Sequence, residues 1–501
     1  MKSKNALDLD AAAWLEAHDG KPLAPRDRMA IPPQEMPAQD PQERRHNMRE
    51  VALGYSEAQA VVEAKRCLQC KNAPCVQGCP VKIRIPEFVG AIANRDFAGA
   101  IGVIRENSLL PAVCGRVCPQ ERQCQAVCTL GKALKDPAKA VAIGRLERFA
   151  ADRERESGAI SMPDIAPPTG KRVAVVGTGP SSITVAADVR RAGHEVTLFE
   201  ALHKPGGVLV YGIPEFRLPK AIVQNEIDAL VAMGVTLEPN FVVGRTRRLR
   251  DLLDRDGFDA VFVGTGAGLP KFMGIEGENL VGVVSANEYL TRSNLLYAYD
   301  TERAHTPAYV SKKLAVLGGG NVAMDAARTA LRLGAETVYL VYRRSADEMP
   351  ARAEEIEHAR EEGVEFLLLS NAKRILGDEQ GRVTAMECLR YDLGEPDASG
   401  RRSPVERPGS EFLLEVDTVV VAIGNGSNPL IGQTTEGLAT DRHGRILVDE
   451  NGMTSIDRVY AGGDIVLGAA TVILAMGEGR KCAASINRQL AGGRASRDVP
   501  S

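Results

Sequence analysis

The sequence predicts an α/β protein in which a helical, cysteine-rich domain precedes two domains built on parallel β-sheets. Eight of the ten cysteines lie between Cys67 and Cys128, in a region whose other residues follow a helical pattern. After residue 170, short β-branched strands alternate with helical stretches, as in βαβ units. Glycine-rich turns at 177–182 and 318–323 each follow an apolar strand and precede a helix. We therefore expect a nucleotide-binding domain at each turn.

The composition is that of a large globular protein. The chain has 501 residues, 44% of them hydrophobic, and this length suggests two or three domains. The formal net charge of −3 gives no electrostatic reason to expect nucleic acid or an anionic membrane as a partner. Apolar runs such as 416–424 are too short to span a bilayer, and residues 1–20 carry acids where a signal peptide is apolar. We expect a cytoplasmic protein that binds neither nucleic acid nor membrane.

The N-terminal third is expected to hold an arm, a helical domain and a linker. Residues 1–45 are rich in proline and charge, which predicts an extended arm with one short helix near Ala11–Ala17. The helical domain is expected over 46–153, with its cysteines at breaks between helices. Residues 154–170 contain proline, glycine and serine and are interpreted as a linker. Later in the chain, the polar segment 392–410 is expected to form a surface hairpin loop.

The cysteines form two groups whose spacing favours iron–sulfur clusters. The groups are Cys67, Cys70, Cys75 and Cys79, and Cys114, Cys118, Cys124 and Cys128. Such spacing lets a loop wrap three thiolates around one cluster, while a fourth cysteine followed by proline, as in Cys79-Pro80, reaches a second cluster. The simplest arrangement is two interlocked [4Fe–4S] clusters, each drawing on both groups.

Structural zinc and unliganded core thiols are the alternatives for these cysteines. Zinc favours two compact CxxC pairs, and Cys67–Cys70 is the only such pair in the sequence. A disulfide framework is not expected, because thiols stay reduced in a large protein that is not exported.

The first glycine-rich turn has a complete dinucleotide-binding pattern. A strand leads into Gly177-x-Gly179-x-x-Ser182, a helix follows, and the next strand ends on Glu200. The first glycine permits the tight turn, the second lets the backbone approach a pyrophosphate, and the carboxylate accepts a ribose hydroxyl. Serine replaces the usual glycine or alanine at the third position and is small enough to fit. The alternative is an ordinary strand–turn–helix without a ligand.

The second turn, Gly318-x-Gly320-x-x-Ala323, differs at the end of its second strand. That strand is followed by Arg343 and Arg344 rather than by a carboxylate. Two guanidinium groups suit a 2′-phosphate and favour NADPH over NADH, unless they form only a solvated strand end. Two nucleotide sites suggest one bound flavin and one exchanging nicotinamide, whose hydride transfer needs orientation rather than an acid–base residue. No catalytic side chain is therefore expected.

Five segments resemble signatures of the glutamate synthase small-subunit family. They are RCLQCKNAPCVQGCP, LPAVCGRVCPQERQC, YGIPEFRLPK (211–220), EMPAR (348–352) and AGGDIVLGAATVILAMGEGR (461–480). The similarity runs from about Met48 to Leu490. Relatives of the family include the N-terminal half of dihydropyrimidine dehydrogenase and the large subunit of NADH-dependent ferredoxin:NADP oxidoreductase. The resemblance implies a disulfide-reductase-like architecture, with an NADPH-binding domain (291–416) inserted in an FAD-binding domain (171–290 and 417–495).

The resemblance also implies a ligand set for each cluster. One cluster would be held by Cys67, Cys70, Cys75 and Cys128, and the other by Cys79, Cys118, Cys124 and Glu147. Cys114 is then spare, whereas the residues alone offer eight thiols for eight places. We favour Glu147 over Cys114 as the eighth ligand; the alternative for Glu147 is a surface acid on a helix.

Further cofactor contacts follow from the same resemblance. Asp464 resembles the family aspartate that hydrogen-bonds the ribityl–pyrophosphate region of FAD, and it also suits a helix N-cap. The turn at Ala470, Thr471 and Val472 would start a helix whose dipole stabilises an anionic reduced flavin. The remaining expected cofactor-binding residues are Gly207, Arg217, Asn321 and Gly463.

The family resemblance implies an electron-input subunit. NADPH would reduce FAD, and electrons would leave through two [4Fe–4S] clusters to a larger subunit that makes L-glutamate from L-glutamine and 2-oxoglutarate. Two related interpretations stay open: the large subunit of a flavin-bifurcating NADH-dependent ferredoxin:NADP oxidoreductase, with its small subunit as partner, and a sulfide dehydrogenase subunit. A dithiol reductase needs a CxxC near the flavin, whereas Cys388 and Cys482 are solitary. A cluster carrier without activity needs no nucleotide-binding domains.

Overall fold

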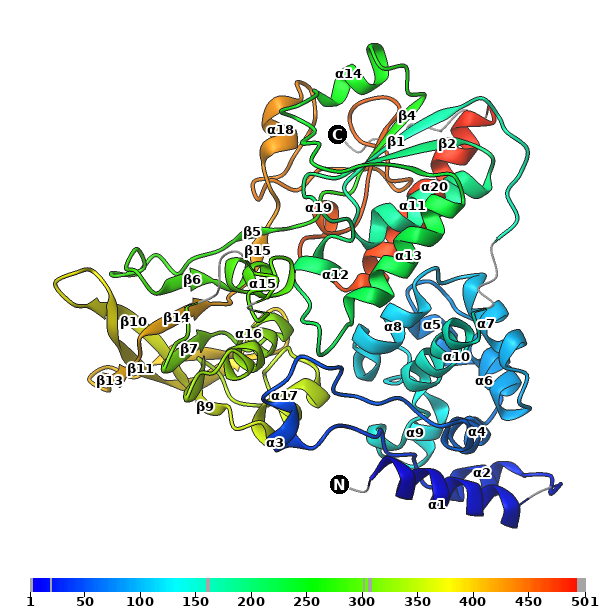
Figure 1. The fold of residues 1–501 in the computed structure, drawn as a ribbon, viewed down its shortest axis with the longest axis horizontal. Coiled ribbons are helices and arrows are strands. Elements are labelled where there is room, and N and C mark those ends of the chain that lie inside the picture. The colour runs from blue at the N-terminus through cyan, green and yellow to red at the C-terminus, as the bar shows by residue number, and fades with distance from the viewer. Residues whose placement is uncertain (1–2, 19, 159–162, 301, 305–308, 493–501) are drawn as a thin grey trace.

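A helical N-terminal region and two five-stranded parallel sheets make up the protein (Figure 1). The structure is a computed structural model that describes residues 3–18, 20–158, 163–300, 302–304 and 309–492. In Figure 1 the first sheet lies at the upper right, the second at the lower left, and the helical region at the lower right. Within the described ranges, every helix is too short or too polar to cross a lipid bilayer.

The N-terminal arm is more helical than expected. It contains α1 (Lys4–Ala17), α2 (Pro25–Ala30) and α3 (Pro41–Arg44), so the expectation of one short helix is wrong. Proline opens α2 and α3 because its missing N–H is not needed in the first helical turn. The arm is anchored by a small core in which Ala11 and Ile31 pack against Val62.

Six of the eight clustered cysteines lie at breaks between short helices, as expected, whereas Cys75 and Cys114 each lie within a helix. The helices are α4 (Glu57–Lys65), α5 (Pro74–Gly78), α6 (Ile85–Ala93), α7 (Phe97–Arg105), α8 (Pro111–Val117), α9 (Thr129–Ala133) and α10 (Ile143–Ser157). Cys79, Cys118 and Cys128 are capping residues of α5, α8 and α9. Because α10 continues to Ser157, the linker begins later than the expected residue 154; residues 159–162 of that linker lie outside the described residues.

The first parallel sheet has the strand order β16-β4-β1-β2-β3. Its strands are β1 (Arg172–Val176), β2 (Glu195–Phe199), β3 (Thr236–Glu238), β4 (Ala260–Val263) and β16 (Val459–Ala461). Alternate residues of β1 face two different cores. Val173 and Val175 join a core that continues into the helical region, together with α11 (Pro180–Arg191), α13 (Lys220–Ala232) and α20 (Val472–Leu490). Ala174 and Val176 face α14 (Leu249–Asp254) and α18 (Leu430–Thr434).

The second parallel sheet has the equivalent order β6-β14-β7-β8-β9. Its strands are β6 (Val283–Ser285), β7 (Lys313–Leu317), β8 (Thr337–Tyr342), β9 (Glu365–Leu368) and β14 (Thr418–Val421). One face packs on α15 (Ala286–Asn294), α16 (Asn321–Arg332) and α17 (Ala353–Glu361). The other face packs on an antiparallel sheet of β10 (Ser370–Gly377), β11 (Val383–Pro396), β12 (Arg402–Glu406) and β13 (Phe412–Glu415). The segment expected to be a hairpin loop, 392–410, contains the β11–β12 hairpin.

Strand pairing corrects the expected domain boundaries. The expected FAD-binding segments, 171–290 and 417–495, include β6 and β14, but β14 pairs in parallel with both β6 and β7 of the second sheet. An apolar run predicts a strand without indicating which sheet it joins. The chain crosses between the sheets at β5 (Leu269–Pro270) and β15 (Asn425–Gly426), which pair with each other. We propose that the two boundaries lie there; residues 493–495 lie outside the described residues.

Candidate cofactor and cluster sites

The first glycine-rich turn has the backbone geometry that a dinucleotide site requires. Gly177 has φ +93°, and a Cβ there would lie 2.6 Å from the Gly264 carbonyl oxygen. Gly179 caps α11, and a Cβ there would meet nothing within 4 Å, so the space above the helix N-terminus is open. Ser182 is fully buried and its hydroxyl donates to the Gly264 carbonyl at 3.4 Å. Serine therefore fits the third position, as expected.

Glu200 organises the loop that follows β2. Its carboxylate accepts hydrogen bonds from the Thr178 hydroxyl and from the Leu202 N–H, the latter at 2.8 Å. The Thr178 hydroxyl oxygen in turn accepts from the Gly206 N–H at 2.9 Å. This chain of bonds brings Gly207 against the glycine-rich turn, where a Cβ on Gly207 would lie 3.0 Å from the Gly179 Cα. Two glycines thus leave the backbone bare where a pyrophosphate would lie.

The first glycine-rich turn and the N-terminal end of α16, which follows the second turn, border one cavity of about 450 Å³. Its walls include the first turn with Glu200 and Gly207, the segment Ala469–Val472, and Asn321, Val322 and Asp325 of α16. The N-terminal ends of α11, α16 and α20 therefore border the same space. Helix N-termini favour anionic groups such as phosphates. The residues present fit a dinucleotide on the first turn that faces the N-terminal end of α16.

Asp464 projects into this cavity after Gly463, whose φ is +79°. Gly463 is the N-cap of α19 (Asp464–Leu467), so Asp464 lies in the first turn and is not itself the N-cap. Burial raises the pKa of Asp464 to about 6, against the opposing effect of a hydrogen bond from the Ala470 backbone. Burial and the nearby Asp464 carboxyl together raise the pKa of Tyr211, another lining residue, to about 12. Thr471 caps α20 by accepting from the Leu474 N–H.

The second glycine-rich turn is held by residues that are distant from it in the sequence. Gly318 has φ +142°, and a Cβ there would lie 2.4 Å from the Ala422 carbonyl oxygen. Gly320 caps α16, and Ala323 is fully buried beneath the turn. The Asn321 side-chain oxygen accepts from the Arg352 N–H at 2.9 Å.

The two arginines after β8 have different environments. Arg343 is exposed. Arg344 is buried and donates to the Arg402 carbonyl at 2.8 Å and to Asp397 at 2.6 Å. The expected pair of free guanidinium groups is therefore reduced to Arg343, because the β11–β12 hairpin engages the second arginine. No signal in the sequence indicates that contact.

Arg217 lines the cavity but is committed to protein partners. Its guanidinium donates to both Asp325 carboxylate oxygens, at 2.7 and 2.8 Å, and pairs with Glu355 at 3.0 Å. It therefore ties the segment 211–220 to α16 and α17, and it was expected instead to contact a cofactor. Lys220 supports the same segment by donating to the carbonyls of Leu209 and Leu218, and burial lowers its pKa to about 8.

Four cysteines expected to share one cluster lie together. Burial raises the pKa of Cys67 to about 11, and Cys128 and Cys70 raise it further. Burial likewise raises the pKa of Cys75 to about 12, with further contributions from Cys67, Cys128 and Cys70. Close thiols that disfavour one another's ionised form are suited to a shared cation or cluster, whose positive charge reverses that effect.

The second expected set, Cys79, Cys118, Cys124 and Glu147, is also brought together. Burial raises the pKa of Cys79 to about 11, and Glu147 and Cys118 add to the rise. Burial followed by Cys79, Cys118 and Glu147 raises the pKa of Cys124. Glu147 lies on α10, burial raises its pKa to about 8, and its Oε1 has no hydrogen-bond partner. A buried, unpartnered carboxylate is costly, and a bound cluster would remove that cost.

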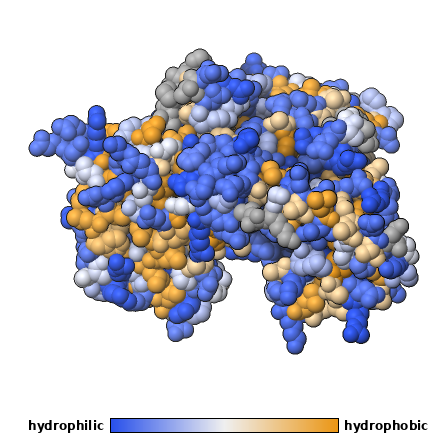
Figure 2. Space-filling model, turned by 60° about the horizontal axis from the view of Figure 1, so that its bottom comes forward, coloured by the Kyte–Doolittle hydropathy of each residue, from blue (hydrophilic) through white to orange (hydrophobic). Residues whose placement is uncertain are grey.

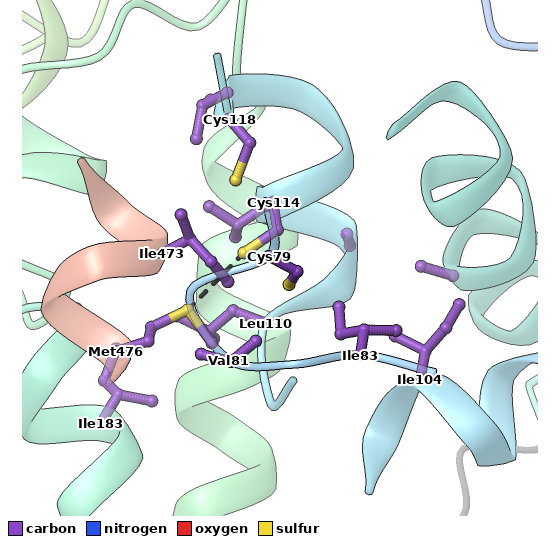
Figure 3. Close-up of a cluster of buried hydrophobic side chains, with 14 of the residues drawn as sticks. Cys79, Val81, Ile83, Ile104, Leu110, Cys114, Cys118, Ile183, Ile473 and Met476 are labelled. Carbon is purple, nitrogen blue, oxygen red and sulfur yellow. Dashed lines mark hydrogen bonds between the residues drawn. The ribbon is translucent and has the colours of Figure 1, made fainter. Parts of the chain in front are cut away.

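The Cys114 side chain faces α20. Its Sγ lies 3.6 Å from the Met476 Sδ on α20, beside Cys79 and Cys118 (Figure 3). All ten cysteines are free thiols. Across the described residues, no three His, Cys, Asp or Glu side chains converge on a position suited to a single metal ion.

Comparisons with known proteins agree with this arrangement. Residues 44–159 match the family model described as dihydropyrimidine dehydrogenase domain II, 4Fe-4S cluster, and residues 171–479 match that of pyridine nucleotide-disulphide oxidoreductase. The chain is 36% identical over 460 residues to the glutamate synthase [NADPH] small chain of Azospirillum brasilense, covering 91% of this chain and 94% of that protein.

Two further similarities bear on length and fold. The chain is 39% identical to the NADP(+)-dependent formate dehydrogenase subunit beta of Moorella thermoacetica, covering 85% of this chain but only 61% of that protein. The structure of Mycobacterium tuberculosis FprA in complex with NADPH is similar with a TM-score of 0.54 at 20% identity, covering 65% of this chain and 85% of FprA. The latter similarity supports the fold.

Proposed function

The chain belongs to the family of NADPH-dependent iron–sulfur oxidoreductases that includes glutamate synthase small chains, and from that premise we propose that it is the electron-input subunit of a glutamate synthase. The family carries FAD, NADPH and 4Fe-4S chemistry on one chain. In the proposed reaction, electrons from NADPH pass to a partner subunit that makes L-glutamate from L-glutamine and 2-oxoglutarate.

The single cavity is the observation that carries this proposal. Bound FAD would supply the chemistry that turns a two-electron hydride into single electrons. The chain's own residues would hold and orient the groups: Gly177, Gly179 and Gly207 leave room for one pyrophosphate, and Gly318 and Gly320 for the other. Because the first turn and the N-terminal end of α16 border the same space, the two cofactors can meet without a large domain movement.

The same cavity lies against the second cluster site. Val117 and Pro119, which flank Cys118, line it. The Gln123 side chain also approaches the Thr471 hydroxyl at 3.4 Å, where α20 begins. We propose that Cys79, Cys118, Cys124 and Glu147 hold the cluster nearer the flavin, and that Cys67, Cys70, Cys75 and Cys128 hold the outer one. Cys70 is the least buried of these cysteines, which supports an exit for electrons on its side.

The preference for NADPH is assigned to Arg343. Its guanidinium is exposed at the end of β8, the position of the ribose 2′-group in this fold. Arg344 would support it indirectly by fixing the β11–β12 hairpin beside it.

The partner and the compartment complete the proposal. Relatives named as small chain or subunit beta imply a partner subunit, which we propose is the large glutamate synthase subunit. We place the protein in the cytoplasm, because free thiols available for cluster ligation persist in a reducing compartment.

A second candidate is electron input to a different acceptor. The 39% identity to the formate dehydrogenase subunit beta favours a general NADP(H)-linked electron module as the alternative. A flavin-bifurcating ferredoxin:NADP oxidoreductase and a sulfide dehydrogenase fall in the same class.

Anaerobic purification of the chain from its own host distinguishes these functions. We expect a large subunit to co-purify, and the complex to form glutamate from glutamine and 2-oxoglutarate with NADPH. A small partner carrying its own flavin and a [2Fe–2S] cluster would replace this proposal by electron bifurcation.

The isolated chain offers a simpler check. NADPH should reduce its flavin without added thiol, and Cys388→Ala should leave that rate unchanged, because Cys388 is fully buried in β11 outside the cavity. A flavin that stays oxidised would contradict the oxidoreductase reaction itself.

A further inference from the structure

The segment 348–352 lies between the NADP(H) turn and the loop of the second cluster. It connects β8 to α17 without regular structure, and Glu348, Met349, Ala351 and Arg352 are all buried. Its backbone holds the glycine-rich turn: the Ala351 N–H donates to the Gly319 carbonyl at 3.2 Å, and the Arg352 N–H donates to the Asn321 side chain at 2.9 Å.

The Arg352 side chain extends the opposite way, into the cysteine-rich domain. Its guanidinium donates to the Arg116 carbonyl at 2.8 Å and to the Gln120 side-chain oxygen at 3.2 Å. Arg116 and Gln120 lie on either side of Cys118. The contact is reciprocal, because Arg122 from the same loop donates to the Met349 carbonyl at 3.0 Å.

Gln120 also contacts α8 and α10, the two helices next to the second cluster site. Its side-chain amide donates to the Cys114 carbonyl on α8 at 3.2 Å. It also packs directly on α10, since a Cβ at Gly144 would lie 2.1 Å from the Gln120 Nε2. Cys118 is the C-cap of α8, and α10 carries Glu147.

Burying the positive charge of Arg352 beside the loop of Cys118 costs solvation free energy. The Arg352 side chain is 9% exposed, and its Nε has no hydrogen-bond partner. Glu354 at 3.1 Å and Glu121 at 3.7 Å balance the charge. A buried cation near Cys118 favours the arrival of an electron at a cluster held there.

We infer that Arg352 is a positioning residue shared by the two sites: it fixes the NADP(H) turn and the second cluster's loop to one another and lends its charge to the cluster. The inference rests on the cofactor assignments of the proposed function. It adds that a single side chain links nucleotide affinity to the cluster's reduction potential.

The test uses the full chain with its clusters and two readouts that need no partner enzyme. In Arg352→Gln we expect NADP⁺ to bind about tenfold more weakly by equilibrium titration, because the segment whose backbone holds the turn loses its side-chain tie to Arg116 and Gln120. We expect the ratio of reduced to oxidised second cluster at a fixed potential, followed by electron paramagnetic resonance, to fall about tenfold, which corresponds to about 59 mV for one electron.

Two further variants, one at Arg352 and one on α17, control for charge and for general damage. Arg352→Lys keeps the charge and should restore the cluster potential to near the wild-type value. Arg360→Gln removes an exposed arginine on α17 that stacks on Phe366, and should change neither readout. A change in only one readout of Arg352→Gln, or in neither, would overturn the inference.

Arg122→Gln covers the case in which Arg352→Gln fails to fold. Arg122 is exposed, yet it makes the return contact to Met349, so its loss should weaken NADP⁺ binding roughly threefold while leaving the fold intact. Unchanged NADP⁺ affinity in this variant would also overturn the inference. A wild-type chain that binds neither NADP⁺ nor clusters would instead refute the proposed function.

Discussion

Two carboxyl groups, half-buried Asp464 and buried Glu147, carry raised pKa values at the two kinds of cofactor site. Burial raises the pKa of Asp464 to about 6 and that of Glu147 to about 8. Each group is ionised at neutral pH only at a cost to the folded state. Such groups are typical of positions that are kept for a ligand rather than for stability.

For Asp464, we predict a gain of stability on neutralisation. A raised carboxyl pKa favours folding below the unfolded value near 4, and this advantage is lost as pH rises through 6. At pH 7.5, the free energy of unfolding of apo Asp464→Asn should therefore exceed that of the wild-type apoprotein by on the order of 2 kcal/mol. Its FAD affinity should fall. Denaturant unfolding of both apoproteins at pH 7.5 and pH 4 checks this, and a stability difference that does not shrink at pH 4 would contradict the assignment.

For Glu147, we predict the loss of one cluster. Glu147→Ala should retain about half of the iron of the wild-type chain, because the second cluster loses a ligand. Cys114→Ala should retain all of it, since the Cys114 thiol contacts Met476. Iron and acid-labile sulfide analysis measures both variants. The reverse pattern would make Cys114 the eighth ligand.

At the scale of helices and strands, local sequence patterns predicted where the elements lie better than they predicted which other elements those elements contact. The strand–turn–helix–strand units at 171–200 and 313–344 form as expected, because apolar runs and glycines act locally. The sheet that β14 joins could not be read from its residues, since an all-buried parallel strand has the same composition in either sheet. The arm's helices were missed because their stability comes from packing on α4 rather than from a strong local signal.

The contact between α11 and α20 is close enough to depend on one glycine. A Cβ at Gly479 would lie 2.4 Å from the Ser181 carbonyl oxygen, and backbone cannot move aside as a side chain can. Gly479→Ala should therefore cost about 1–3 kcal/mol of unfolding free energy and also weaken FAD binding, because Ser181 lines the cofactor cavity.

Gly102 on α7 is the matched control. A Cβ there would meet nothing within 4 Å, so Gly102→Ala should stabilise the protein by about 0.5–1 kcal/mol through helix propensity. Thermal unfolding should show a lower melting temperature for Gly479→Ala and a higher one for Gly102→Ala. Equal shifts in the two melting temperatures would show that the contact between α11 and α20 tolerates a Cβ at residue 479.

Across the whole molecule, buried ion pairs join the arm and the two sheets. Arg44 is fully buried and pairs with Glu361 at 2.6 Å and Glu362 at 2.8 Å on the second sheet's side (Figure 1). Although burial alone would raise it, Arg328 and Arg332 hold the pKa of Glu362 far below its usual value. A cavity lined by the arm, α8, α10 and α17, including Glu361, lies near these pairs. Figure 2 shows a notch at the lower edge of the molecular surface.

We predict that Arg44→Ala destabilises the protein by about 1.5–3 kcal/mol, because buried Glu362 and half-buried Glu361 each lose a charge-assisted hydrogen bond, while Arg328 and Arg332 still pair with Glu362. Arg84→Ala is the control: its ion pairs with Glu87 and Glu106 are exposed and should contribute less than about 1 kcal/mol. Urea unfolding followed by circular dichroism measures both. A loss in Arg44→Ala no larger than in Arg84→Ala would mean that the arm is not a structural tie.

The sequence supported the cofactor types and the grouping of the cysteines, because these depend on spacing within short segments. It could not indicate that Arg344 engages Asp397 or that Arg217 engages Asp325 and Glu355. Those contacts join residues that are far apart in the chain. The segment 348–352 was visible as a family signature, and only the three-dimensional structure relates it to Gln120.

The ion pair between Arg44 and Glu362 also sets an order of events during translation. Its two residues are 318 positions apart, so the arm leaves the ribosome long before its binding surface exists. The Arg44 guanidinium must remain hydrated while both sheets are being made, since domains assemble as they emerge. The end of the arm, although it is made early, is thus among the last segments to reach its final place.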